Sequence, residues 1–162
     1  MTQYQPIFAT RYALRIAEVR QLLTGAGIAA DPTVVHPEEL ERVVAGAGNC
    51  LVIVDGQSLP HVDALARLRR LSPDSCVVIW TDRLSAEMLL ATMECSLHGL
   101  LSSRLPAEEA AHALQRICLG ERLLRFDSAP ESPKSGRRVA AAPTFDAQWM
   151  LDGAADSKGR ET

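Results

Sequence analysis

Apolar residues in the first 126 positions follow two alternating patterns. Short uninterrupted runs, such as residues 51–54 and 76–80, are typical of strands that are covered on both faces. Between these runs, apolar residues recur every three or four positions, as Val62, Leu65 and Leu68 do. That spacing predicts amphipathic helices whose apolar side faces a sheet.

The two patterns alternate five times. The predicted strands cover residues 6–10, 28–35, 51–54, 76–80 and 97–101, and the predicted helices cover 12–24, 37–47, 62–71, 85–95 and 106 to near 120. Strict alternation with short connections predicts an α/β fold, a doubly wound five-stranded parallel sheet. In such sheets chemistry lies at the carboxyl ends of the strands, here just after residues 10, 55, 81 and 101.

The pattern changes near residue 127. Residues 128–138 are polar and rich in Pro and Ser, which predicts a domain over 1–126 and a disordered, flexible C-terminal tail over 127–162. Within the tail, residues 144–151 suit a short helix, with Phe145 and Trp149 four positions apart and Met150 beside them. This segment is a candidate for docking on a partner or on the same chain. The alternatives are an incidental apolar patch or the remnant of a lost output domain.

Composition narrows the function classes. A net charge of −3 favours neither nucleic acid nor an anionic membrane as a partner. No apolar run is long enough to span a membrane and no leader pattern is present, so we expect a soluble cytoplasmic protein. The four cysteines form no C-x-x-C pair, which indicates buried reduced thiols rather than a zinc site. No phosphate loop, nucleophile elbow or zinc-protease motif occurs, so we expect no enzyme, no metal and no cofactor.

Three segments resemble the receiver domains of response regulators. They are Val52-Ile53-Val54-Asp55 with Leu59-Pro60 downstream, Val78-Ile79-Trp80-Thr81-Asp82, and Gly99-Leu100-Leu101-Ser102-Ser103 with Leu105-Pro106 downstream. The resemblance implies a flavodoxin-like (βα)5 fold over residues 1–126 and a role in two-component signalling. The closest similarity is to the receivers of helix-turn-helix transcription factors.

The resemblance also implies a set of reactive groups. Receivers use an Asp at the end of the third strand as phosphoacceptor, a hydroxyl after the fourth strand and a Lys after the fifth, which together with Mg²⁺ neutralise the phosphoryl group. Asp55 is the candidate phosphoacceptor and Thr81 matches the hydroxyl, but Ser103 stands at the lysine position. The first lysine of the chain is Lys134.

The magnesium-binding pair of acids is missing as well. The positions after the first strand are Thr10 and Arg11, and the first carboxylate of the chain is Glu18. We expect Arg11 to place a positive charge where a metal would sit. Asp55 precedes Pro60 by five positions where the family has four, so alignment on Pro60 places Gly56 at the acceptor position.

These losses predict an atypical, phosphorylation-independent signalling or regulatory protein-interaction module. Its partner would be a sensor kinase or another regulator, and the face formed by the helix at 85–95, the strand at 97–101 and the last helix could form a homodimer.

Three other functions are weighed. A conventional phosphoacceptor receiver would use Asp55. A transcription regulator would need a DNA-binding domain, for which the 36 residues after Phe126 are too few and too polar. A small enzyme on the same fold would need Asp55, Asp82 and His61 to come together.

Overall fold

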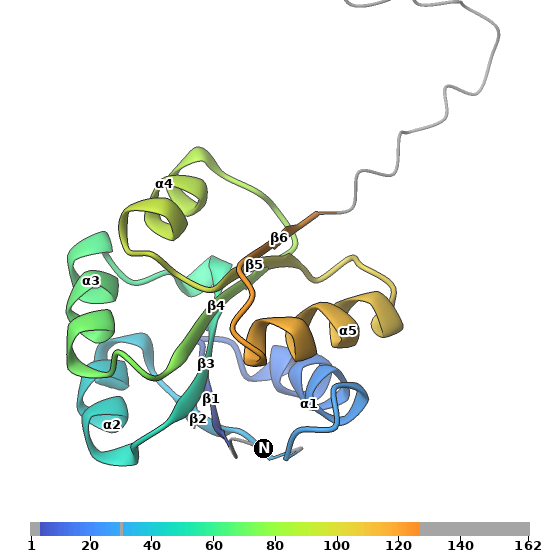
Figure 1. Cartoon of the computed structure of the whole chain (residues 1–162), viewed down its shortest axis with the longest axis horizontal. Helices are drawn as coiled ribbons and strands as arrows, with labels where there is room; N and C mark the ends of the chain where they lie inside the picture. Colours follow the sequence, from blue (N-terminus) through green and yellow to red (C-terminus); the bar gives the residue numbers. More distant parts are fainter. Residues whose placement is uncertain (1–3, 30, 127–162) are drawn as a thin grey trace, which may run out of the picture. The chain divides into compact units, whose positions relative to one another are not determined.

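The computed structural model describes residues 4–29 and 31–126, which form one six-stranded parallel sheet covered by helices on both faces (Figure 1). The strand order is β2-β1-β3-β4-β5-β6. The strands are β1 (Gln5–Ala9), β2 (Thr33–Val35), β3 (Cys50–Asp55), β4 (Cys76–Thr81), β5 (Gly99–Ser102) and β6 (Leu123–Arg125). The helices are α1 (Ile16–Gly25), α2 (Leu40–Ala47), α3 (Val62–Leu71), α4 (Ala86–Glu94) and α5 (Ala107–Cys118), with short 3-10 turns η1 (Ala13–Arg15), η2 (Pro37–Glu39) and η3 (Gly56–Ser58).

The predicted doubly wound parallel sheet is confirmed. Helices α1 and α5 cover one face, and α2, α3 and α4 cover the other (Figure 1). The two central strands, β3 and β4, are buried along their whole length, which is why their sequences are continuous apolar runs instead of alternating ones. Alternate residues point to opposite faces, so Leu51 and Ile53 pack towards α1 and α5, whereas Val52 and Val54 pack towards α2, α3 and α4.

The sequence predicted five strands, whereas the sheet of the described residues has six. After α5, Gly120 adopts a φ of 98°, a left-handed conformation that suits glycine, and the chain turns back to add β6 beside β5. Leu123 packs into the core on the α1/α5 side, and Phe126 packs against the core on the other side. A strand of three residues, such as β6, is too short for an alternating apolar pattern to be recognised in the sequence.

The first helix also begins later than predicted. Tyr12 is 48% exposed and lies in a loop, and the 3-10 turn η1 precedes α1. This turn brings Arg15 to the carboxyl end of the sheet, although the sequence had assigned these residues to a regular helix. The predicted tail, with its candidate helix at 144–151 and the residues Phe145, Trp149 and Met150, lies outside the described residues.

The helices of residues 4–29 and 31–126 include none that is both long and apolar enough to cross a lipid bilayer. The cysteines of this part are free thiols, with Cys50, Cys76 and Cys95 buried and Cys118 half-buried. Burial raises the pKa of each thiol above its ordinary value, in the case of Cys118 to about 12. This direction favours the neutral thiol over the reactive thiolate.

Candidate functional site

Asp55 is the last residue of β3, and its carboxylate is wholly buried at the carboxyl end of the sheet. It stands opposite Trp80 of β4 in the strand register. Because side chains alternate along a strand, Asp55 points to the same face as Ile53, towards α1 and α5. A buried carboxylate needs partners for its charge and for its oxygens.

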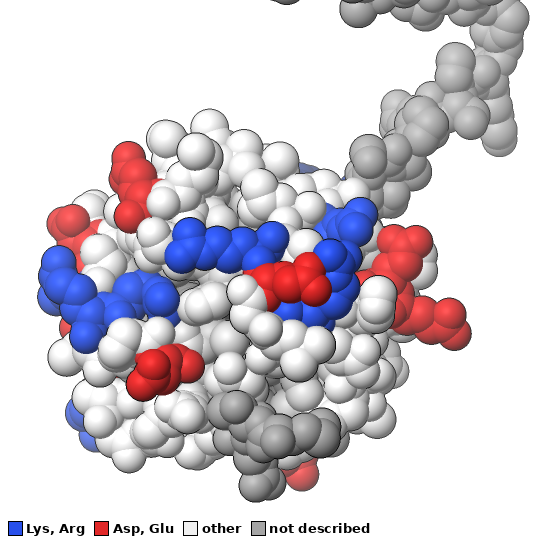
Figure 2. All heavy atoms as spheres, viewed as in Figure 1, with Lys and Arg blue, Asp and Glu red and all other residues white. Residues whose placement is uncertain are grey.

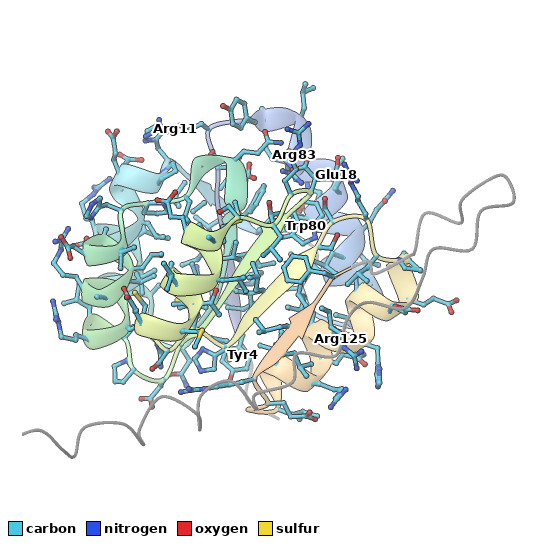
Figure 3. All side chains as sticks on the ribbon, turned by 90° about the horizontal axis from the view of Figure 1, so that it is seen from above. Tyr4, Arg11, Glu18, Trp80, Arg83 and Arg125 are labelled. Carbon is cyan, nitrogen blue, oxygen red and sulfur yellow. The ribbon has the colours of Figure 1, made fainter. Side chains whose placement is uncertain are left out.

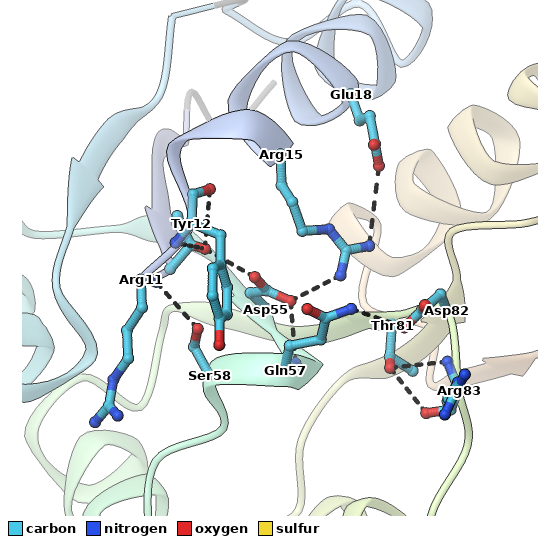
Figure 4. A network of polar contacts seen from close by, with 11 residues as sticks. Arg11, Tyr12, Arg15, Glu18, Asp55, Gln57, Ser58, Thr81, Asp82 and Arg83 are labelled. Atoms are coloured by element: carbon cyan, nitrogen blue, oxygen red, sulfur yellow. Dashed lines mark hydrogen bonds and ion pairs between the residues drawn. The ribbon is translucent and has the colours of Figure 1, made fainter.

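Three groups supply those partners (Figure 4). The hydroxyl of Thr10 donates to Oδ2 of Asp55 at 2.7 Å. Nη1 of Arg15 and the backbone N–H of Gln57 donate to Oδ1 at 3.0 and 3.1 Å. Both oxygens are therefore engaged, one of them by a charge-assisted bond from a guanidinium.

Arg15 is held in place by more than this ion pair. Its side chain is only 11% exposed, and its guanidinium carbon lies 4.7 Å from the centre of the Trp80 ring. That distance allows a cation–π attraction, which is stronger where water is excluded. Nη2 of Arg15 also lies 3.9 Å from a carboxylate oxygen of Glu18. The guanidinium thus sits between an aromatic face and two carboxylates, as Figure 4 shows for Asp55 and Glu18.

The loop after β1 is tied to the same site. Oγ1 of Thr10, besides donating to Asp55, accepts a hydrogen bond from the backbone N–H of Tyr12 at 2.9 Å. The backbone N–H of Arg11 donates to Oγ of Ser58 at 3.0 Å. These bonds connect β1 to the turn that follows β3 and fix the position of η1, which carries Arg15.

The expectation for Arg11 was wrong. Its side chain is 53% exposed and pairs with Glu38 at 3.4 Å, away from Asp55. The positive charge at the site comes from Arg15 instead. The sequence analysis did not single out Arg15, which lies at the end of the 3-10 turn η1 and is buried there.

Gly56 occupies the position that alignment on Pro60 gives to the phosphoacceptor. A Cβ atom on Gly56 would lie 2.5 Å from Cβ and 2.6 Å from Oγ1 of Thr81, too close for any side chain without a shift. The side chain of Thr81 therefore fills the space that a side chain at position 56 would need. Asp55, one residue earlier, points to the opposite face of the sheet.

The Thr81 hydroxyl is used within its own loop. It donates to the carbonyl of Arg83 at 2.8 Å and accepts from the N–H of the same residue at 3.2 Å. Ser103, at the position of the family lysine, donates its backbone N–H to the carbonyl of Thr81 at 2.7 Å. This backbone hydrogen bond joins the end of β4 to the residue that follows β5.

Asp82 lies beside this loop and accepts a hydrogen bond from Nε2 of Gln57 at 3.3 Å. Partial burial opposes its ionisation, but that bond and the positive charges of Arg15 and Arg83 prevail and lower the pKa of Asp82 below its ordinary value. His61 is 81% exposed, and its Nδ1 accepts a bond from the backbone N–H of Asp63. Residues 4–29 and 31–126 bring no three His, Cys, Asp or Glu side chains together as a metal-binding group.

The magnesium ion that receivers use does not fit these residues. Mg²⁺ prefers oxygen ligands in an octahedral shell, and both carboxylate oxygens of Asp55 are already bonded, Oδ2 to Thr10 and Oδ1 to Arg15. The guanidinium would repel a divalent cation at this distance. The guanidinium of Arg15, and not a metal ion, supplies the positive charge that balances the carboxylate of Asp55.

Neither a protein-family model nor a curated protein matches the sequence. Among solved structures, the isolated receiver (REC) domain of RcsB from Salmonella enterica serovar Typhimurium aligns with a TM-score of 0.64 at 14% identity, over 76% of this chain and 94% of that one. The described chain has the receiver-domain fold.

Two further solved structures resemble the receiver fold of this chain. A LuxR family DNA-binding response regulator from Silicibacter pomeroyi has a TM-score of 0.60 at 21% identity, over 75% of this chain and 96% of that one. A putative pilus assembly-related protein from Burkholderia pseudomallei has a TM-score of 0.56 at 20% identity, over 75% and 95%. At these identities the likeness concerns the fold, and function has to be argued from the site.

Proposed function

We propose that the chain is a receiver-like signalling module that works without phosphorylation and acts through protein–protein contacts. The observation that carries the proposal is the buried ion pair between Arg15 and Asp55, at 3.0 Å. In a receiver the carboxylate at the end of the third strand faces a metal ion and a phosphoryl group, whereas here a guanidinium of the chain pairs with it. On this proposal the carboxylate of Asp55 stays bonded to Arg15 and Thr10, and the site does not switch between a free and a phosphorylated form.

Physical chemistry supports this reading of the ion pair. Phosphoryl transfer needs an accessible carboxylate oxygen and cations placed to neutralise the transferring group. Asp55 is wholly buried, both of its oxygens accept hydrogen bonds, and the chain has no lysine before Lys134. Alignment on Pro60 gives the acceptor position to Gly56, which has no side chain and packs closely against Thr81.

The contact surface we propose is the face formed by α4, β6 and α5. Since β6 pairs along the outer edge of β5, the face predicted from the sequence now presents β6 in place of β5. Leu90 and Met93 on α4 are 55% and 73% exposed, and Leu124 on β6 is 53% exposed. Apolar side chains of this size on one face suit a partner protein or a second copy of the chain.

Treatment with Mg²⁺ and a small phosphodonor, followed by intact-mass analysis, tests the proposal. We expect no phosphorylated species, with a phosphorylatable receiver treated in parallel as positive control. Stoichiometric addition of one phosphoryl group that disappears in Asp55→Asn would overturn the proposal.

That outcome would establish the alternative, a conventional receiver that uses Asp55. The alternative rests on the position of Asp55 at the end of β3, where receivers carry their acceptor. It requires the Arg15 side chain to leave the carboxylate first. If it holds, Arg15→Gln should be labelled faster than the wild-type chain, a comparison that separates a slow acceptor from an inert one.

A further inference from the structure

Strand β6 is an outer strand of the sheet, and its free side has no neighbouring strand among the described residues. The N–H of Leu123 donates to the carbonyl of His98, on the β5 side. Because successive residues of a strand direct their backbone groups to opposite sides, the N–H and C=O of Leu124 point outwards. Figure 3 looks onto this strand, with Tyr4 at the amino edge of the sheet, where the strands begin, and Arg83 at the carboxyl edge. An open outer strand of this kind is a template for pairing with another strand.

The side chains of β6 alternate between the two faces of the sheet. Leu123 packs into the core beneath α1 and α5, and Arg125 lines a pocket together with residues of α5. Leu124 and Phe126 therefore lie on the other face, where Phe126 packs against the core beneath α2, α3 and α4. Leu124 is exposed, so this face of β6 is left largely uncovered within the described chain.

Helix α4 lies on the same face and leaves apolar side chains on its outer side. Leu90 and Met93 are both exposed. The helix has no Lys or Arg and only two acids, Glu87 and Glu94, and most of its visible surface is uncharged in Figure 2. Leu90, Met93 and Leu124 thus leave apolar surface on the face of the sheet that has an open strand, which favours a partner that brings a strand of its own.

The sequence of β6 is complementary to itself in one register. In an antiparallel pair of β6 strands related by a two-fold axis at Leu124, each Leu124 lies opposite its counterpart, and Arg122 lies opposite Phe126. Residues 122, 124 and 126 direct their backbone groups outwards, so they are the positions able to exchange hydrogen bonds. Arg125 then lies opposite Leu123, and neither arginine faces another arginine, an arrangement that would be repulsive.

Charges on the α5 side of β6 do not oppose a second copy. Arg125 shares its pocket with Glu109, and Nε of Arg116 lies 2.9 Å from Oε2 of Glu121. These acids reduce the positive charge that two adjoining β6 strands would bring together.

We propose that two copies of this chain associate by antiparallel pairing of their β6 strands, which joins the two sheets into one. The inference rests on the contact face proposed above and assigns that face to a second copy. Each copy would offer the N–H and C=O of Leu124 to the other, and the two α4 helices would lie on the same face of the joined sheet. Since β6 has only three residues, the association should be reversible and depend on concentration.

Analytical ultracentrifugation of the full chain, from about 10 µM to about 1 mM, tests the pairing. We expect the mass of two chains at the upper end. Leu124→Lys and Leu124→Glu should each weaken association by about tenfold or more, because like charges then face each other at the two-fold axis. An equimolar mixture of the two variants should associate again, because opposite charges then face each other. Leu14→Lys, at an exposed position in η1, is the control and should associate as the wild-type chain does.

Three results would overturn the inference. The first is the mass of one chain at every concentration. The second is unchanged association of Leu124→Lys and Leu124→Glu, which would place the contact elsewhere. The third is a mixture of the two variants that stays monomeric, which would mean that Leu124 does not face its counterpart. Because Leu124 is exposed, these substitutions should leave the circular dichroism spectrum unchanged. If the chain stays monomeric and Asp55 takes up no phosphoryl group, the function proposed above stands and only the dimer fails.

Discussion

Single residues determine the chemistry available at the carboxyl edge of this sheet. Asp55 is buried with a guanidinium and a hydroxyl as its partners, and the neighbouring Gly56 leaves no room for another carboxylate beside Thr81. A buried ion pair is costly to disturb, since removal of one partner leaves the other charge buried and uncompensated. The guanidinium of Arg15 thus supplies the positive charge beside the Asp55 carboxylate.

Arg15→Met should therefore destabilise the fold strongly. The substitution retains most of the apolar stem that packs near Trp80 but leaves Asp55 without its cation, at a cost of about 3 kcal/mol in the free energy of unfolding. Urea denaturation followed by circular dichroism measures the change. Arg20→Met, which removes an exposed partner of Asp31, is the control and should leave the midpoint nearly unchanged. Equal midpoints for the two variants would show that the buried pair contributes nothing.

Gly56→Ala should be harmful for a steric reason. The new Cβ would lie 2.5 Å from Cβ of Thr81, and we expect a loss of about 1–3 kcal/mol in stability. Gly46→Ala is the matched control, because nothing lies within 4 Å of its Cβ position and alanine favours the α2 helix. It should raise the melting temperature slightly. A Gly56→Ala protein as stable as the wild type would contradict the close packing at the end of β3.

At the level of elements, short pieces of structure place the important side chains. The 3-10 turn η1 carries Arg15 to Asp55, and η3 supplies the backbone N–H of Gln57 to the same carboxylate. The strand β6 closes the edge of β5 and holds Arg122 beside His98. His98 itself connects β4 and β5, through its ring on Val77 N–H and through its own N–H on the Val77 carbonyl.

The contact between β4 and β5 should depend on pH. Burial, with the charges of Arg69 and Arg122, places the folded-state pKa of His98 below its ordinary value of 6.5. The unfolded chain then takes up the proton first, so stability is complete above about pH 6.5 and declines as pH falls towards the folded-state pKa. Protonation of Nδ1 would also remove the acceptor for Val77 N–H.

Urea denaturation at about pH 7.5 and about pH 5 measures this effect. The fall in stability between the two values should be smaller in His98→Gln than in the wild-type chain. His112→Gln, at an exposed position on α5, is the control and should behave as the wild type does. The same fall in all three proteins would contradict a role for His98.

At the scale of the whole described domain, the sheet separates features with different chemistry. The carboxyl edge holds the Arg15–Asp55 pair, His98 lies at the amino edge, and α4 and β6 expose the apolar side chains Leu90, Met93 and Leu124. Such a division suits a module that presents surfaces to other molecules. Association through the face proposed above would bury Leu90, Met93 and Leu124.

Leu90→Glu combined with Met93→Glu should abolish self-association or partner capture. Charged side chains at these exposed positions would be desolvated in any complex, so affinity should fall by about tenfold or more, while the fold, which does not bury them, should persist. Light scattering and pull-down from the native cell measure the two outcomes. Leu14→Glu, at a position 93% exposed on another side of the domain, is the control. Unchanged association in the double variant would exclude this face.

The sequence by itself determined the layered α/β fold, because continuous apolar runs and 3.6-residue periods allow few other arrangements. It also determined that the acid pair and the lysine are absent, since no carboxylate precedes Glu18 and no lysine precedes Lys134. Only the tertiary structure decided which arginine pairs with Asp55. Arg11 and Arg15 both follow β1 closely, but Arg11 pairs with Glu38, whereas the 3-10 turn η1 places Arg15 beside Asp55. Likewise β6 depends on its pairing with β5, a contact between distant segments that no local pattern records.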